Sequence, residues 1–383
     1  MKRVAQRVVE ERCRDNQVVV VLSAMGDTTD DLVDLAHQVC KEPPQREMDM
    51  LLSVGERMSI ALLAMAITDL GYQAMSFTGS QIGIITDNRH TDARILEVRG
   101  LRIQEALDSG KIVVVAGFQG VSVDKEITTL GRGGSDTTAL ALAAALNAER
   151  CEIMKDVDGV YIAEPRIIPQ PKMNSEISYD EMIEMANMGA GVLKTESVEI
   201  ARHYGVKVAV GSSFTGKVGT IITERPHDTS AISGIVKQSG MLYVKTELPT
   251  LNEKNRFNQL MADHRIKVQA YAFQPGSVEL VCQKRFLADI RRIVRGINRK
   301  EPELSLYSES VGIIAIIGTG LNFNSETALR IFEAVERLKL EPRMLQISEL
   351  RISWIMEEDR VDQTVQHLYR ELIPEEASAS EQH

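Results

Sequence analysis

The sequence has few cysteines and no excess of positive charge. Its four cysteines, Cys13, Cys40, Cys151 and Cys282, show no paired spacing, which excludes a zinc ribbon and gives no disulfide framework. Asp and Glu outnumber Lys and Arg by 54 to 44, for a net charge of -10. Nucleic acids and anionic membranes are bound by clustered basic residues. We therefore expect small molecules as partners, no nucleic acid or membrane, and no metal site built from protein ligands.

Two further features are missing: an apolar run of membrane length and a secretory signal. The first residues, MKRVAQRVVEERCRDN (1–16), have the charge pattern of an amphipathic helix rather than that of a signal peptide. We therefore expect a protein of the reducing cytoplasm.

The chain length of 383 residues exceeds one ordinary core, so we expect two or more domains. The first part alternates short apolar runs with helical patterns, which is typical of a mainly parallel sheet covered by helices on both faces. This pattern indicates the α/β class. The predicted helices lie near 28–41 and 47–70, and the predicted strands cover 18–22, 112–118, 151–156, 206–214 and 219–223.

A different rhythm follows the polar, turn-forming residues 225–240. The order strand, helix, strand, strand, helix occurs twice, which is typical of small ferredoxin-like α+β modules. An α/β domain followed by two repeated modules indicates an enzyme whose first domain carries out the reaction and whose repeated modules regulate it. The predicted domains are 1–228, 241–302 and 303–373, with a polar, disordered tail at 374–383.

A glycine-rich turn stands directly before a helix in GRGGSDTTALALAAALNA (131–148). In an α/β sheet, ligands bind beyond the carboxyl ends of the strands, where helix N-termini present unpaired N–H groups. Glycines let these groups approach an anion, and the guanidinium of Arg132 suits a bidentate grip on a carboxylate or phosphate. A tight loop with an ordinary N-cap is the alternative interpretation. Capping oxygens are expected from Ser135, Asp136, Thr137 and Thr138.

Two other segments carry similar chemistry. VVVLSAMGDTTDDL joins a buried strand to a helix start and supplies Ser23, Thr28 and Thr29. KDVDGVYIAEPR follows another strand, and a solvated turn is the alternative interpretation for it. Its polar side chains are those of Lys155, Asp156, Asp158, Tyr161 and Arg166.

The segment GSSFTGKV (211–218) nearly matches a P-loop but is not expected to be one. Val218 replaces the hydroxyl residue that would bind magnesium, and the next residues, GTIIT, are typical of a strand rather than a helix.

Five segments occur in an order that resembles the aspartate kinases of the amino acid kinase family. They are VVVLSAMGDTTDDL, LLSVGERMSIALLA, VVAGFQG, GRGGSDTTALALAAALNA and KDVDGVYIAEPRI. The later segments VGIIAIIGTGLNFNSETALRIFEAV and MLQISELRISWIM are similar to tandem ACT domains. The resemblance covers nearly the whole chain. It implies an αβα sandwich with the amino acid kinase fold, lacking its first strand, followed by two ferredoxin-like ACT domains.

The resemblance implies transfer of the ATP γ-phosphoryl group to the side-chain carboxylate of L-aspartate, the first step of lysine, threonine and methionine biosynthesis. Catalysis would then consist mainly of positioning and charge neutralisation. Arg132 would hold a carboxylate of aspartate, and Glu56 of GERMS would receive its ammonium group. Hydroxyls of Ser23, Thr29 and Ser135 would complete the pocket. By spacing alone, Glu56 is a surface glutamate on a helix.

The nucleotide, ATP with Mg²⁺, would lie beside the aspartate. The resemblance implies that Asp136 orients the reacting groups near the magnesium and a lysine. Gly191 replaces a lysine that many family members direct to the nucleotide, and Lys194 or Lys217 is a candidate to compensate. Residues on the nucleotide side would be Gly133, Gly134, Lys155, Asp156, Tyr161 and Arg166.

The ACT-like modules imply control by lysine, threonine or methionine and a homodimer formed through these modules. The residues expected to contact such an effector are Asn322, Ser325 and Gln346.

One element that the resemblance implies is missing from the sequence. Family members open with Lys-Phe-Gly-Gly-Thr-Ser, whose lysine neutralises the transferring phosphoryl group, whereas Met1 begins inside the following helix. Loss of such a cation would raise the reaction barrier by several kcal/mol. We expect either a longer gene product, which we favour because the substrate residues are intact, or a short form with little activity. The short form would be a non-catalytic amino acid sensor or regulatory subunit.

Overall fold

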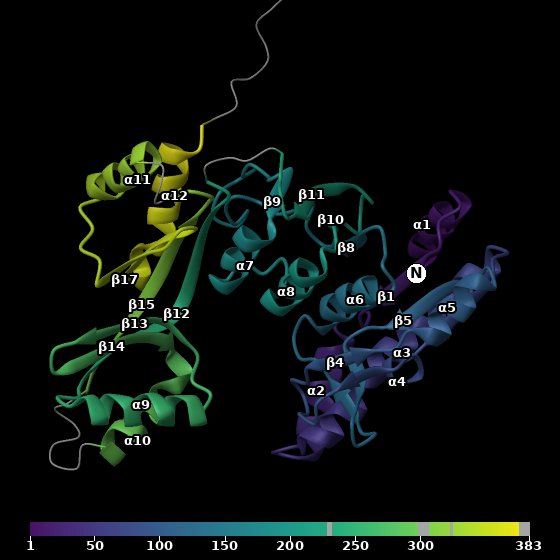
Figure 1. The fold of residues 1–383 in the computed structure, drawn as a ribbon, viewed down its shortest axis with the longest axis horizontal. Helices are drawn as coiled ribbons and strands as arrows, with labels where there is room; N and C mark the ends of the chain where they lie inside the picture. The colour runs from purple at the N-terminus through teal and green to yellow at the C-terminus, as the bar shows by residue number, and fades with distance from the viewer. Residues whose placement is uncertain (228–231, 298–305, 322–324, 375–383) are drawn as a thin grey trace, which may run out of the picture. The chain divides into compact units, whose positions relative to one another are not determined.

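The computed structural model describes residues 1–227, 232–297, 306–321 and 325–374, which divide into two compact units (Figure 1). The first unit comprises Met1–Val160, Ser175–Ile183 and Gly191–Asp228, and the second comprises Tyr161–Asn174, Glu184–Ala190 and Thr229–His383. The chain therefore passes between the units more than once. The predicted domain boundaries at 228, 241 and 303 stay predictions.

The first unit contains the predicted succession of helices and parallel strands. Its helices are α1 (Lys2–Cys13), α2 (Thr28–Val39), α3 (Gln45–Asp69), α4 (Gly79–Ile82), α5 (Leu101–Asp108), α6 (Gly134–Ala145), α7 (Tyr179–Asn187), whose last residues belong to the second unit, and α8 (Thr195–Tyr204). Its strands are β1 (Val19–Leu22), β2 (Ala74–Phe77), β3 (Ile84–Thr86), β4 (Ile95–Val98), β5 (Ile112–Ala116), β6 (Gln119–Ser122), β7 (Ile127–Thr129), β8 (Cys151–Lys155), β9 (Glu176–Ser178), β10 (Val208–Ser212) and β11 (Val218–Thr223).

Strand β5 lies at the centre of an αβα sandwich. It pairs in parallel with β1 and β2 and is buried along its whole length. Ile112, Val114 and Ala116 pack against α1 and α3, whereas Val113 and Val115 pack against α5 and α6 on the opposite face. Burial of each of these Ile and Val side chains contributes about 1.5–3 kcal/mol to folding. The predicted fold class, a mainly parallel sheet between helical layers, is confirmed.

Two further sheets complete the first unit. Strands β8, β10, β11 and β9 form one sheet, in which β10 and β11 are an antiparallel pair joined by a short turn. The segment 211–218 therefore belongs to a hairpin, and the rejection of a P-loop is confirmed. Strands β4, β3, β6 and β7 form a largely antiparallel sheet that the sequence did not predict. These strands have only three or four residues each, too few for a clear alternation of side chains.

Helix α3 corrects the expectation that no apolar run reaches membrane length. An 18-residue window within it has a mean hydropathy of 1.6, which is long and apolar enough to cross a membrane. The same helix buries Leu52, Ile60, Leu63 and Ile67 inside the first unit. Three of these side chains pack with α1 and β5. Packing within the unit therefore accounts for one face of α3, whereas other apolar side chains of the helix, including Leu62 and Met65, are exposed.

The second unit is built on one six-stranded antiparallel sheet in the order β13-β14-β12-β15-β17-β16. Its elements follow the predicted double order of strand, helix, strand, strand, helix, which confirms the ferredoxin-like repeat. They are β12 (Gly234–Glu247), α9 (Leu251–Asp263), β13 (Val268–Gln274), β14 (Ser277–Gln283), α10 (Leu287–Ile297), β15 (Leu306–Ile317), α11 (Ser325–Arg337), β16 (Met344–Ile347), β17 (Arg351–Glu357) and α12 (Val361–Leu372), with 3-10 turns at Lys284–Phe286 and Glu358–Arg360.

The long strands β12 and β15 each contribute to two hydrophobic cores, one with α9 and α10 and the other with α11 and α12 (Figure 1). Val244 lies in the core around the fully buried Phe257, whereas Ile235 lies in the core around Trp354. The register of β12 shifts near Gly240, which has a φ of 73°. This bulge lets one strand serve both cores. Strand β12 therefore begins seven residues before residue 241, where the second predicted domain starts.

Candidate active site

The ends of β1 and β5 meet the start of α6 at one place. The N–H of Gly117 donates to the carbonyl oxygen of Leu22 at 2.9 Å. A Cβ atom at Gly117 would lie 2.6 Å from Oγ of Ser135 and 3.0 Å from that carbonyl oxygen. A side chain at residue 117 would thus collide with the first turn of α6. This juxtaposition is the edge at which parallel α/β sheets bind ligands.

The glycine-rich turn adopts a conformation that glycine permits. Gly131 and Gly133 have φ values of 70° and 74°, in the left-handed region. Gly133 is the N-cap of α6, and no side chain caps this helix. The expected capping by Ser135, Asp136, Thr137 and Thr138 is therefore wrong: the hydroxyls of Thr137 and Thr138 donate to the carbonyl oxygens of Gly133 and Gly134.

The N-terminus of α6 is open to a ligand. Among the described residues, the N–H groups of Ser135 and Asp136 donate no hydrogen bond. Arg132, three residues before Ser135, is exposed and forms no ion pair within the part of the chain that the structure describes. Unpaired N–H groups and an unpaired guanidinium together form an anion-binding arrangement.

A buried carboxylate lies on α3 near the end of β1. Glu56 is 3 % exposed, and its Oε1 accepts a hydrogen bond of 3.0 Å from the N–H of Ala24. Its Oε2 is buried and has no partner among the described residues. Burial raises the pKa of Glu56, although hydrogen bonds from backbone N–H groups oppose the shift. Gly55 permits this contact between elements, because a Cβ there would lie 2.8 Å from Cβ of Ala24.

Lys155, at the end of β8, reaches the first turn of α6. Its Nζ donates to Oδ2 of Asp136 at 2.9 Å and to the carbonyl oxygen of Val192 at 2.6 Å. The Lys155 and Asp136 side chains are 27 % and 15 % exposed, so this ion pair is partly shielded from water. The structure therefore brings together two of the predicted residues from separate segments. The neighbouring Asp156 is exposed.

Lys194 lies along the glycine-rich turn. Its Cβ would be 3.2 Å from a Cβ at Gly133, and its Nζ is 3.5 Å from the carbonyl oxygen of Leu130. The backbone of Lys217 belongs to the turn between β10 and β11, where its carbonyl oxygen accepts from the N–H of Ser212. Ser212 pairs with Lys155 of β8, so the backbones of both Lys194 and Lys217 lie near the candidate site and both lysines stay candidates.

Other predicted residues are less closely grouped. Ser23 follows β1 and is exposed, and Thr29 is half-buried in the first turn of α2. Tyr161 and Arg166 belong to the second unit, where Tyr161 forms a bridge with Met173 and Arg166 is exposed.

The predicted effector residues fall in the second unit. Asn322 lies outside the described residues. Ser325 begins α11, and Gln346 is on β16 opposite Ser353 of β17.

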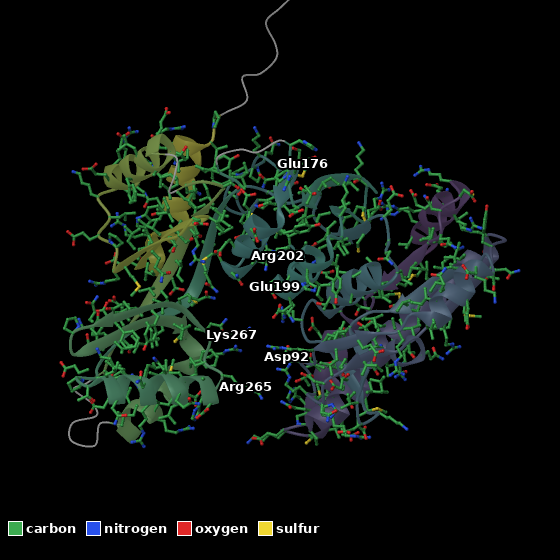
Figure 2. All side chains as sticks on the ribbon, in the orientation of Figure 1. Asp92, Glu176, Glu199, Arg202, Arg265 and Lys267 are labelled. Carbon is green, nitrogen blue, oxygen red and sulfur yellow. The ribbon has the colours of Figure 1, made fainter. Side chains whose placement is uncertain are left out.

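Sequence reasoning missed a buried cluster beside the glycine-rich turn. Asp49 on α3 is completely buried and contacts the segment around His90 and Thr91, as well as Thr129 of β7. Asp92, labelled in Figure 2, is the next residue of that segment. The only available signal was the position of Asp49, seven residues before Glu56 on the same predicted helix.

Comparison with known proteins agrees with this geometry. Residues 1–212 match the amino acid kinase family. The aspartokinase of Mycolicibacterium smegmatis is 42 % identical over 387 residues, covering 96 % of this chain and 91 % of that protein. This chain is an aspartokinase of the amino acid kinase family.

Solved structures of aspartokinases show the same fold. The R-state crystal structure of E. coli aspartokinase III in complex with aspartate and ADP has a TM-score of 0.78 at 24 % identity, covering 97 % of this chain and 84 % of that chain. Aspartate kinase from Synechocystis has a TM-score of 0.54 at 34 % identity, covering 98 % of this chain and 67 % of that chain. The predicted family is confirmed by its members' sequences and its fold by their structures.

Proposed function

We propose that this aspartokinase transfers the γ-phosphoryl group of ATP to the side-chain carboxylate of L-aspartate. A carboxylate oxygen of aspartate attacks the γ-phosphorus, the bond to the bridging oxygen of ADP breaks, and the products are 4-phospho-L-aspartate and ADP. The site must hold several negative charges close together, so positioning and charge neutralisation carry most of the catalysis. We place the enzyme in the cytoplasm.

The observation that carries this proposal is the unpartnered Oε2 of Glu56. A buried carboxylate without a counterion is costly unless a ligand supplies one. The α-ammonium group of an amino acid is a suitable partner, because it brings a positive charge and three N–H donors. Glu56 lies beside Ala24, so we propose that the hydroxyls of Ser23 and Thr29 complete the aspartate pocket there.

The negatively charged groups of aspartate and ATP would bind at the glycine-rich turn. We propose that Arg132 holds a carboxylate of aspartate by a bidentate contact, with Ser135 beside it. The open N–H groups at the start of α6 and the bare backbone of Gly133 and Gly134 would receive phosphate oxygens.

Asp136 and Lys155 would act next to the transferring group. Lys155 already donates to Asp136. In this proposal the pair orients the reacting carboxylate oxygen of aspartate, and the ammonium group of Lys155 faces the negative charge of the transferring phosphoryl group. The described residues contain no group of three or more His, Cys, Asp or Glu side chains that could hold a metal. We therefore propose that magnesium arrives on the ATP phosphates, with Asp136 as a carboxylate able to contribute. In the first unit, Asp156 would contact the rest of the nucleotide, whereas the roles of Tyr161 and Arg166, which belong to the second unit, stay predictions.

The second unit would regulate the first. Its ferredoxin-like repeat supports binding of an amino acid effector, and we propose lysine, threonine or methionine, contacted by residues near Asn322, Ser325 and Gln346. The same unit would form the homodimer. Titration of each amino acid during turnover tests this: inhibition by one or more is expected, and indifference to all of them would reject the regulatory role.

The test of the catalytic proposal is trapping of the acyl phosphate with hydroxylamine, which converts it to a hydroxamate. The chain is assayed as it stands and with an N-terminal Lys-Phe-Gly-Gly-Thr-Ser strand added. Glu56→Gln should remove aspartate-dependent hydroxamate formation, whereas Glu47→Gln, an exposed position on the same helix, should not. If neither form of the unsubstituted chain gives hydroxamate, the catalytic proposal is rejected.

The alternative is an amino acid sensor without turnover. Calorimetry separates the two functions. A sensor binds an effector amino acid and gives no hydroxamate in either form.

A further inference from the structure

Asp49 holds three groups from two separate segments. One carboxylate accepts from the N–H of Thr91, at 3.0 Å to Oδ1 and 3.2 Å to Oδ2, and from the hydroxyl of Thr129, at 2.5 Å. Nδ1 of His90 lies 2.7 Å from Oδ2. Asp49 has no exposed surface, so these contacts are made away from water, where a lost partner is costly.

One of these contacts stabilises an unfavourable backbone conformation. Thr91 has a φ of 65°, which is rare for a β-branched residue and persists only where the surroundings enforce it. The hydrogen bond from its N–H to Asp49 is one such constraint. Another is the hydrogen bond of 2.9 Å from the N–H of Ala93 to the carbonyl oxygen of Thr129. Asp49 thus determines the path of the segment His90–Asp92.

That segment lies directly against the glycine-rich turn. A Cβ at Gly131 would be 3.0 Å from Oδ1 of Asp92 and 3.2 Å from the carbonyl oxygen of Thr91. Thr129 begins the same turn from the other side, two residues before Gly131. Asp49 therefore holds both the segment that packs against Gly131 and Thr129, the residue from which the turn starts. Arg132 directly follows Gly131, so its position depends on these contacts.

We propose that Asp49 is a positioning residue for Arg132, and hence for the carboxylate of aspartate that Arg132 binds. Asp49 touches no substrate and acts through Thr91 and Thr129. This inference rests on the proposed function. It also gives α3 a second role, because Asp49 and Glu56 are seven residues apart, about two turns along one helix face. A single helix would then position the ammonium group of aspartate through Glu56 and one of its carboxylates through Asp49 and Arg132.

The test is a double-mutant cycle on the full chain, read as the Kd for aspartate. Asp49→Asn keeps the shape but presents a poorer acceptor, and it should raise the Kd about tenfold to a hundredfold. In an Arg132→Ala background, titrated by ligand-detected NMR at millimolar aspartate, the same change should have less than a threefold effect. Asp69→Asn, an exposed position on α3, is the matched control and should bind like the unsubstituted chain.

Two variants at Thr129 test the same contact without altering a charge. Thr129→Ser keeps the hydroxyl, so its Kd for aspartate should stay within about threefold of that of the unsubstituted chain. Thr129→Val removes the hydroxyl and should raise the Kd as much as Asp49→Asn does. Thermal melts check that each variant is folded.

Three results would overturn the inference: normal binding by Asp49→Asn, an equal effect of that change in the Arg132→Ala background, or no difference between Thr129→Ser and Thr129→Val. If the unsubstituted chain binds no aspartate, the proposed function fails and the inference fails with it. If the unsubstituted chain binds aspartate but the variants give one of these three results, the inference fails and the proposed function does not.

Discussion

A single methyl group at residue 117 should impair phosphoryl transfer more than it impairs folding. In Gly117→Ala, the new Cβ would lie 2.6 Å from Oγ and 2.7 Å from Cβ of Ser135. Carbon atoms in ordinary contact are about 3.5–4.0 Å apart, so one partner must move by about 1 Å. Leu22 cannot yield easily, because its carbonyl oxygen already accepts from residue 117. The start of α6 must therefore shift.

The expected magnitudes differ for stability and activity. Overpacking of this kind costs about 1–3 kcal/mol, which corresponds to a decrease in Tm of several degrees. A displacement of about 1 Å at a catalytic group costs about a hundredfold in rate. We therefore expect kcat/KM for aspartate to fall about a hundredfold in Gly117→Ala, measured by hydroxamate trapping in whichever form of the chain turns over.

Gly296→Ala, on α10 of the second unit, is the matched control, since no atom lies within 4 Å of a Cβ there. It should retain nearly full activity. If Gly117→Ala keeps more than half of kcat/KM, or if both variants lose activity equally, the assignment of the site to the junction of β1, β5 and α6 is wrong.

Three further changes have defined outcomes. Burial raises the pKa of Glu56 in the folded protein, so the ionised carboxylate destabilises the fold as the pH rises. Glu56→Gln should therefore raise Tm, and by more at pH 8 than at pH 5. A lower Tm of this variant at both pH values would contradict the prediction. Lys155→Met removes the ammonium group on Asp136 and should lower kcat/KM at least about tenfold in the hydroxamate assay; unchanged turnover would exclude Lys155 from the site. Thr250 caps α9 by accepting from the N–H of Glu253 at 3.2 Å, so denaturant melts of Thr250→Ala should show a loss of about 0.5–2 kcal/mol and those of Thr250→Ser little change, whereas equal losses would rule out the cap.

The parts of the fold that the sequence predicted are those with a strong local pattern. The apolar runs that form β1 and β5 are visible within a few residues, and both strands occur where expected. Lys155 and Asp136 were each predicted as site residues, although their ion pair, which joins the end of β8 to the first turn of α6, was not.

The parts that the sequence did not predict depend on contacts between distant residues. The role of Asp49 is set by Thr91 and Thr129, which are 42 and 80 positions away, and nothing local distinguishes it from an exposed aspartate. Capping of α6 failed because of where the helix starts: Gly133, which has no side chain, is the N-cap, and the four predicted capping residues lie inside the helix.

The most direct test of the central claim is a crystal structure of the chain with L-aspartate and a non-hydrolysable ATP analogue. The account predicts the ammonium group of aspartate within hydrogen-bond distance of Oε2 of Glu56, and one of its carboxylates on the guanidinium of Arg132. Aspartate bound elsewhere, or Oε2 still without a cation at saturating aspartate, would contradict it.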